Sequence, residues 1–299
     1  MGVSETVSIV VATNRSGAYL AEAIDSASAQ SYGSFEIVVV DDGSPNPEAI
    51  AQTVRRFPAA RLIRRRPSGV AAARNAGVRA SRGDLIAFLD DDDRWHPGCL
   101  EAHVSALAAA PDAVASYCRI QTIDAGGDRV LAPADQVAVR SRAEVAARRT
   151  GIFAGNLVVR RRHFEAVGGF AEDLHHAEDL DLILSLAERG RLVFAEAGLV
   201  DYRSHGENTT QRYRELVRAI DHVLRSHRDR ALASEDPELA AAFEESLARN
   251  ARFAWWSAAR AAKADLSRRR PVAAAGELAW ALRAAPGGLW SGVTRRLSS

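Results

Sequence analysis

Short runs of β-branched and aliphatic residues alternate, over the first 120 residues, with longer stretches whose apolar residues recur at helical spacing. The runs that predict strands are residues 7–12, 35–40, 61–64 and 85–89. Strands separated by helices pair in parallel, because each crossover helix returns the chain to the same end of the sheet. The sequence therefore predicts an α/β domain with a Rossmann-like, mostly parallel central sheet.

The pattern becomes mixed after residue 111 and entirely helical after residue 211. Strands are predicted over 113–120, 156–159, 192–195 and 199–202, and a helix over 180–188 that Gly190 ends. No linker rich in Pro, Gly and Ser separates these residues from the first part, so we predict one continuous domain over 1–211. In the region 212–299, apolar spacing predicts helices beginning near Tyr213, Pro237 and Pro271.

Composition excludes several classes of protein. With 299 residues, 47% of them hydrophobic and 26% charged, the chain can bury a core and is not a disordered one. It contains no apolar run near the ~18 residues of a membrane span and no basic region ahead of an apolar stretch, so we expect a cytoplasmic protein. Cys99 and Cys118 are too few for a disulfide framework or a cysteine zinc site, and are expected to pack as reduced apolar residues.

Carboxylates directly follow two of the predicted strands. Residues 35–40 lead into Asp41-Asp42-Gly43-Ser44, and residues 85–89 lead into Asp90-Asp91-Asp92-Asp93. Ligands of open α/β sheets bind outside the carboxyl ends of the strands. Four consecutive carboxylates are costly there unless a cation or hydrogen-bond donors offset their charge. Oxygen ligands select Mg²⁺ or Mn²⁺, commonly completed by substrate phosphates, so we expect a divalent metal and a phosphate-bearing ligand at this edge.

Simpler roles remain open for the same residues. An Asp-Asp-Gly-Ser turn after a strand is also a common helix cap, and an acidic run is commonly a solvated loop. Other acidic motifs do not fit. The Asp-x-Asp-x-Thr pattern of phosphatases meets Arg94 where Thr is required, and the calcium loop meets Trp95 where Gly is required. The Gly-rich dinucleotide and phosphate-loop motifs do not occur.

Five blocks, in order, resemble the family 2 glycosyltransferases of GT-A fold. They are VSIVV at 7–11, FEIVVVDDGS at 35–44, GVAAARNAG at 69–77, GDLIAFLDDDD at 83–93, and Glu178-Asp179. The resemblance spans roughly residues 5–205. It implies a GT-A catalytic domain over 1–211, with a nucleotide-sugar half to about residue 110 and an acceptor half beyond it, followed by a helical C-terminal extension.

The resemblance also implies an activity. It implies an inverting hexosyltransferase that moves a sugar from a nucleotide diphosphate sugar to an acceptor hydroxyl with the help of Mn²⁺ or Mg²⁺. A UDP-sugar is favoured as the donor, with GDP and dTDP as alternatives. The acceptor class is a glycan, a lipid-linked glycan or another precursor, as in polysaccharide biosynthesis.

Site residues follow from the resemblance, block by block. Asp179 resembles the general base, and Arg74 resembles a basic residue of the donor-binding helix. Asp90 and Asp92 align with the family's Asp-x-Asp, the first near the ribose and the second on the metal, with His205 as a further metal ligand. The remaining nucleotide-binding candidates are Ala12, Thr13, Asn14, Asp41, Asp42 and Asp91, of which Asp42 resembles the aspartate that contacts the base. Acceptor or supporting candidates are Asp93, Trp95, Asn156 and Glu178.

The chain departs from the family pattern in two places. Many relatives have Pro-x-Tyr-Asn after the first strand, whereas this chain reads Ala12-Thr13-Asn14-Arg15 and lacks the aromatic residue. The Gln-x-x-Arg-Trp segment of processive synthases is absent, which favours transfer of a single sugar. Two alternatives remain: a non-catalytic nucleotide-sugar binding or scaffold protein, and a sugar-phosphate nucleotidyltransferase. The Gly-rich loop with Arg that the latter needs after its first strand is missing.

The C-terminal region is basic and carries tryptophans. Residues 250–299 hold 9 basic and 2 acidic side chains, together with Trp255, Trp256, Trp280 and Trp290. A basic helical segment with aromatic anchors is typical of a peripheral contact with the inner face of a membrane, and a lipid-linked acceptor would explain it. The alternative is that the same helices pack on the first domain or on a second subunit of a homodimer. We expect no nucleic acid, because no recognition motif accompanies the charge.

Overall fold

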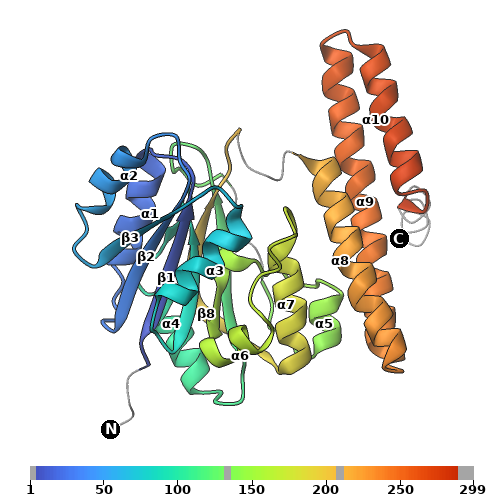
Figure 1. Ribbon diagram of the computed structural model, residues 1–299. Coiled ribbons are helices and arrows are strands. Elements are labelled where there is room, and N and C mark those ends of the chain that lie inside the picture. The colour runs from blue at the N-terminus through green and yellow to red at the C-terminus, as the bar shows by residue number, and fades with distance from the viewer. Residues whose placement is uncertain (1–4, 131–135, 207–211, 289–299) are drawn as a thin grey trace. The chain divides into compact units, whose positions relative to one another are not determined.

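The computed structural model describes residues 5–130, 136–206 and 212–288 (Figure 1). The chain divides into two compact units. The first comprises residues 1–145 and 149–206, and the second comprises residues 146–148 and 207–299. The boundary predicted at residue 211 lies outside the described residues.

A single eight-stranded sheet forms the centre of the first unit, with the strand order β3-β2-β1-β4-β7-β6-β8-β5. The strands are β1 (Val7–Thr13), β2 (Phe35–Asp42), β3 (Ala60–Arg65), β4 (Leu85–Asp90), β5 (Arg94–Trp95), β6 (Ala115–Ile123), β7 (Leu157–Arg160) and β8 (Leu192–Arg203). Strands β1 to β4 pair in parallel, as do β6 and β8, whereas β7 and β5 run antiparallel to their neighbours. The predicted α/β fold with a mostly parallel sheet is confirmed.

Helices cover both faces of this sheet. The helices up to residue 189 are α1 (Ala18–Ser28), α2 (Pro47–Val54), α3 (Val70–Ala80), α4 (Cys99–Ala108), α5 (Arg142–Ala146), α6 (Arg161–Ala166) and α7 (Glu178–Arg189), with a short 3₁₀ turn, η1 (Ala154–Asn156). Because successive strand residues point to opposite faces, Ile9 of β1 packs with apolar residues of α1, α2 and α4. Its neighbour Val10 lies against Gly77 of α3, where a Cβ atom would clash with it. Gly77 thus lets α3 lie close to the sheet.

The register of the parallel strands places their acidic ends side by side. Thr13 is paired with Asp41, Ala12 is paired with Asp90, and Asp42 is paired with Arg65. The carboxyl ends of β1, β2 and β4 therefore meet at one edge of the sheet, as expected from the crossover pattern.

Three helices, α8 (Tyr213–Ala233), α9 (Pro237–Ser267) and α10 (Pro271–Ala284), lie in the second unit. Asp236 precedes α9, and its carboxylate accepts a hydrogen bond from the Leu239 N–H and caps the helix. Trp280 is buried in this unit's core with Ala254 and Ala258. No helix among the described residues is both long and apolar enough to cross a bilayer.

The tryptophans expected as membrane anchors differ in how deeply they are buried. Trp280 is a core residue, and Trp255 is half-buried with its indole Nε1–H donating to the Ala285 carbonyl. Trp256 is exposed, whereas Trp290 lies outside the described residues. The expectation of a surface anchor was therefore wrong for Trp280.

Candidate active site

Asp41 and Asp42, at the end of β2, hold the turns around them. The Asp41 carboxylate is fully buried and accepts a hydrogen bond from the Ser44 N–H at 2.8 Å. Asp42 accepts hydrogen bonds from the N–H groups of Ser68 and Gly69, at 3.1 and 2.8 Å. These contacts fix the loop that leads into α3, so Asp42 joins the strand edge to the start of that helix.

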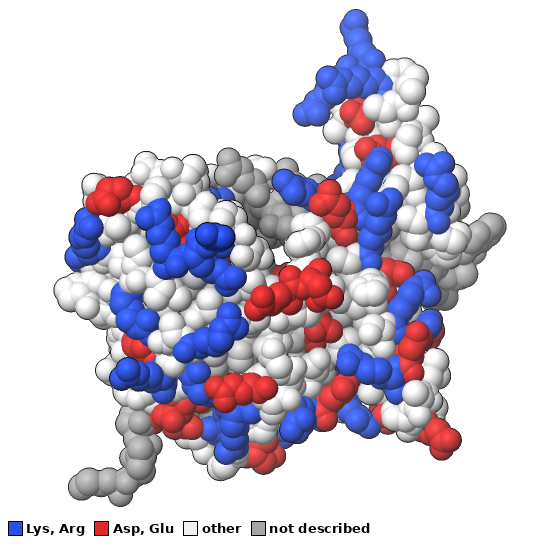
Figure 2. All heavy atoms as spheres, in the orientation of Figure 1, with Lys and Arg blue, Asp and Glu red and all other residues white. Residues whose placement is uncertain are grey.

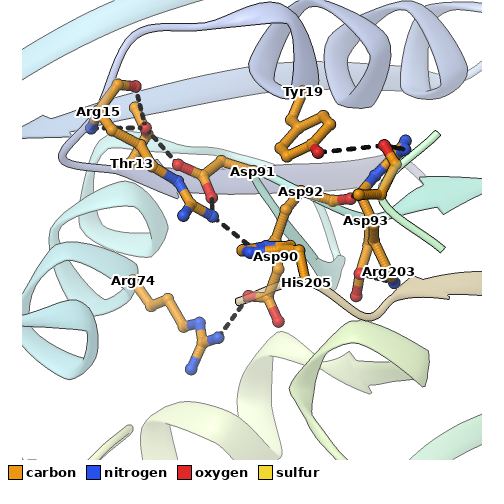
Figure 3. A network of polar contacts seen from close by, with 11 residues as sticks. Thr13, Arg15, Tyr19, Arg74, Asp90, Asp91, Asp92, Asp93, Arg203 and His205 are labelled. Carbon is orange, nitrogen blue, oxygen red and sulfur yellow. Dashed lines mark hydrogen bonds and ion pairs between the residues drawn. The ribbon is translucent and has the colours of Figure 1, made fainter. Parts of the chain in front are cut away.

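The four carboxylates after β4 each have a different set of partners (Figure 3). Asp90 Oδ1 lies 2.5 Å from Arg74 Nη2, and Asp91 Oδ2 accepts a hydrogen bond from the Thr13 hydroxyl at 2.5 Å. Asp92 Oδ2 lies 2.8 Å from His205 Nε2, and Asp93 Oδ1 accepts a hydrogen bond from the Arg203 N–H at 2.8 Å. The structure therefore brings His205, from beyond β8, into contact with the acidic run, as the prediction of a shared site requires.

Asp93 is the most deeply buried of the four carboxylates. It is 1% exposed, and its Oδ2 has no hydrogen-bond partner. Burial, together with the charges of Asp90 and Asp92, raises the pKa of Asp93 well above its ordinary value. Burial also raises the pKa of Asp91, although Arg15 and Thr13 oppose that effect. The buried position of Asp93 fits the supporting role predicted for this carboxylate.

Arg203 clamps the end of β8 to the acidic run. Its buried guanidinium donates from Nε to the Asp92 carbonyl at 2.8 Å and from Nη2 to Glu22 at 2.6 Å. It lies over the ring of Tyr19, 4.4 Å from the centroid, and that ring in turn lies 5.5 Å from the His205 ring. His205 was predicted as a site residue within the segment Tyr202-Arg203-Ser204-His205, whereas no role was predicted for Arg203 or Tyr19.

Arg74 joins the acidic run to the start of α7. One side-chain nitrogen lies 2.5 Å from Asp90 Oδ1 and the other lies 2.9 Å from Glu178 Oε1. Asp179 follows Glu178 in the first turn of α7, where burial and the Glu178 charge raise its pKa to about 6, with Arg74 acting in the opposite direction. A carboxylate with a pKa near neutrality can accept a proton efficiently.

The donor set at Asp92 and His205 fits a hard divalent cation in part. A carboxylate suits Mn²⁺ and Mg²⁺, which commonly complete their shells with water and substrate phosphates, whereas an imidazole is a poorer ligand for the harder Mg²⁺ than for Mn²⁺. Among the described residues, the group of three or more potential ligands within 4.8 Å of one another is Cys99, His103 and Cys118, all buried. The two cysteines are free, with 3.9 Å between their sulfurs.

The other predicted residues lie around this centre. Ala12, near the end of β1, is partly buried, and Asn14 is exposed just beyond the strand. Trp95 is buried, and its indole Nε1–H donates to the Gly155 carbonyl at 3.2 Å. Asn156 is also buried, and its amide nitrogen donates to the Cys118 carbonyl at 2.8 Å. Both side chains therefore bond to backbone carbonyls of other segments.

Comparisons with known proteins point to one family. The model of the family described as Glycosyl transferase family 2 matches residues 8–168. An uncharacterized glycosyltransferase of Rickettsia felis is 29% identical over 213 residues, which cover 69% of this chain and 35% of that protein. One from Haemophilus influenzae is 26% identical over 184 residues, 61% of this chain and 62% of the relative. The chain thus spans about a third and about three fifths of these two relatives.

Solved structures share the fold. S. aureus TarS 1-349 superimposes with a TM-score of 0.64 at 19% sequence identity, covering 94% of this chain and 81% of that one. The same protein in complex with UDP gives a TM-score of 0.57 at 18% sequence identity, and the match covers 73% of this chain and 65% of that one.

Proposed function

The chain belongs to glycosyl transferase family 2 and is a glycosyltransferase, and from that premise we propose that it is an inverting, divalent-metal-dependent enzyme. It transfers a hexose from a nucleotide diphosphate sugar to the hydroxyl of a glycan or lipid-linked glycan, with residues 1–211 as its catalytic domain. The UDP bound by the structurally similar TarS favours a UDP-sugar as the donor, over GDP- or dTDP-sugars.

The observation that carries the proposal is the meeting of charged groups from separate parts of the chain. Asp92 contacts His205, and Arg74 contacts both Asp90 and Glu178, next to Asp179. A solvated acidic loop would not need a buried arginine and a histidine from distant elements. A site for a diphosphate, a dication and an attacking hydroxyl needs both signs of charge close together.

The roles follow from the chemistry of glycosyl transfer. The transition state resembles an oxocarbenium ion, while negative charge grows on the leaving diphosphate. A cation held by Asp92 and His205 would neutralise that charge. Asp179 accepts the proton of the acceptor hydroxyl, and attack opposite the leaving group inverts the anomeric centre. Arg74 holds Asp90 and Glu178 so that the donor end and the base end of the site keep their spacing.

A thermal-shift panel tests donor binding directly. UDP-, GDP-, dTDP- and CDP-sugars are added to the full chain with and without Mn²⁺. One nucleotide is expected to stabilise the protein by about 2.7 kcal/mol at a hundredfold excess over Kd, and only with the metal. No response to any nucleotide would contradict the proposal. Release of pyrophosphate from a nucleoside triphosphate and a sugar phosphate would instead identify a nucleotidyltransferase, and binding without transfer would identify a scaffold protein.

We further propose that the second unit contacts the anionic inner face of a membrane. Val272, Leu278 and Leu282 of α10 are exposed, as are Trp256 and Leu266 of α9. Basic side chains gather at the end of the α9–α10 hairpin (Figure 2), where the turn carries Arg268, Arg269 and Arg270. An apolar helix face beside clustered arginines is complementary to an anionic lipid surface, whereas two copies of this surface would repel each other.

Vesicle co-sedimentation tests this contact. The full chain is expected to sediment with vesicles that contain a third phosphatidylglycerol and not with pure phosphatidylcholine. The double variant Val272→Glu, Leu282→Glu should lose most of that binding, while Leu232→Glu, at an exposed apolar position of α8, should keep it. A dimer that the double variant dissociates, without binding to either vesicle, would assign the face to a second subunit instead.

A further inference from the structure

One oxygen of Asp92 is shared by two side chains from different parts of the chain (Figure 3). Asp92 Oδ2 lies 2.7 Å from Arg15 Nη2 and 2.8 Å from His205 Nε2. The same Arg15 nitrogen also donates to Asp91 Oδ1 at 3.0 Å. The guanidinium of Arg15 therefore bridges two of the carboxylates in the run, at the ligand proposed above for the metal.

The backbone of Arg15 is held in place while its side chain reaches outward. The Thr13 hydroxyl accepts a hydrogen bond from the Arg15 N–H at 3.2 Å and lies 2.8 Å from the Arg15 carbonyl. The Arg15 side chain is 35% exposed, in contrast to 7% for Arg74. A long side chain on a fixed backbone can move between partners without unfolding the strand end.

Asp91 and Asp92 each have a second partner. The Thr13 hydroxyl contacts Asp91 at 2.5 Å, and His205 contacts Asp92. Arg15 is therefore not needed as the sole partner of either carboxylate. An ion pair at this exposure contributes about 0–1 kcal/mol to stability, so a structural role alone gives a weak reason for its placement.

We propose, on the basis of the function proposed above, that Arg15 couples metal binding to donor binding. A dication and a guanidinium repel each other and compete for the same Asp92 oxygen. A donor brings a diphosphate, which the planar guanidinium binds in bidentate fashion. When Arg15 turns to the diphosphate, Asp92 is released for the metal. Each ligand then raises the affinity for the other by the same factor.

Binding of Mn²⁺, measured by electron paramagnetic resonance of the free ion, tests the coupling without any transfer reaction. In the unchanged chain, saturating UDP is expected to tighten Mn²⁺ binding on the order of tenfold or more. In Arg15→Gln, Mn²⁺ should bind more tightly than in the unchanged chain when UDP is absent, because its competitor is gone. UDP should then add little further affinity.

Arg94→Gln is the matched control. Arg94 has a similar side-chain exposure of 31%, and its ion-pair partners are Asp201 and Glu22 rather than Asp91 or Asp92. It should bind Mn²⁺ as the unchanged chain does, with and without UDP. Arg15→Lys, which keeps the charge but lacks the planar fork, should retain the competition and lose much of the UDP effect.

Two different results would contradict the role of Arg15 and the proposed function. If the unchanged chain shows UDP-coupled Mn²⁺ binding and Arg15→Gln shows the same affinities and the same coupling, the role of Arg15 is overturned alone. If the unchanged chain binds neither Mn²⁺ nor any nucleotide, the function itself is overturned.

Discussion

Replacing Asp179 with Asn lowers kcat by roughly 10²- to 10⁴-fold, while the affinity for the donor nucleotide stays nearly the same. This is the expected loss when a general base is removed. Asn keeps the size and polarity of the side chain but cannot accept the proton of the acceptor hydroxyl. The measurement is steady-state transfer with a responding nucleotide sugar, together with calorimetric titration of the nucleotide.

The pH dependence gives this prediction a second readout. The pKa of Asp179 is raised to about 6, and the base acts only when it is deprotonated. Transfer by the unchanged protein should therefore fall about tenfold for each pH unit below 6, and Asp179→Asn should lose this acid limb. Asp181→Asn, in the same turn of α7, is the control. It should keep both the transfer rate of the unchanged protein and the fall of that rate below pH 6. Unchanged turnover in Asp179→Asn would remove the base assignment.

Replacing Arg74 with Met should destabilise the protein by about 3–5 kcal/mol. Its side chain is 7% exposed and its two partners are Asp90 and Glu178. Removing one member of a buried ion network leaves the opposite charges uncompensated. Arg74 also holds the pKa of Asp179 down, so the acid limb of transfer should move to higher pH in this variant.

Urea unfolding and the pH profile of transfer check both effects. Arg79→Met is the matched control on the same helix, because Arg79 is 64% exposed and lies 3.8 Å from Glu172. That exposed pair should contribute at most about 1 kcal/mol. If the free energy of unfolding of Arg74→Met lies within about 1 kcal/mol of that of the unchanged chain, and if its transfer rate falls over the same acid pH range, Arg74 does not hold the site together.

The first four strands could be predicted because their signal is local. Each is a short run of β-branched and aliphatic residues with a helical pattern later along the chain, so both the strands and the shared edge of their carboxyl ends follow from the pattern. The order beyond β4 depends on long-range pairing, in which β7 inserts antiparallel between β4 and β6. Two strands were predicted over 192–202, where the structure has the single strand β8. In the pairing of β6 with β8, Cys118 lies opposite Ala195 and Arg119 lies opposite Leu199, so residues 196–198 of β8 are left out of the register.

The site was predictable where residues follow a strand and unpredictable where long side chains reach across the fold. The acidic run and His205 are marked by position. Arg15 and Arg203 are two of 39 basic residues, nearly all of them Arg. Asp92, the partner of Arg15, lies 77 positions away in the sequence, and Glu22, the partner of Arg203, lies 181 positions away. These contacts could not be predicted from the neighbouring sequence, because only the folded sheet brings the partners together.

The central claim is that the acidic strand ends bind a nucleotide together with a divalent cation. Calorimetric titration of the nucleotide found in the panel, with Mn²⁺ and with EDTA, tests it on the unchanged chain and on Asp92→Asn. We predict metal-dependent binding in the unchanged chain and at least tenfold weaker binding in Asp92→Asn. Equal affinity with Mn²⁺ and with EDTA, unaltered by the substitution at Asp92, would contradict the account.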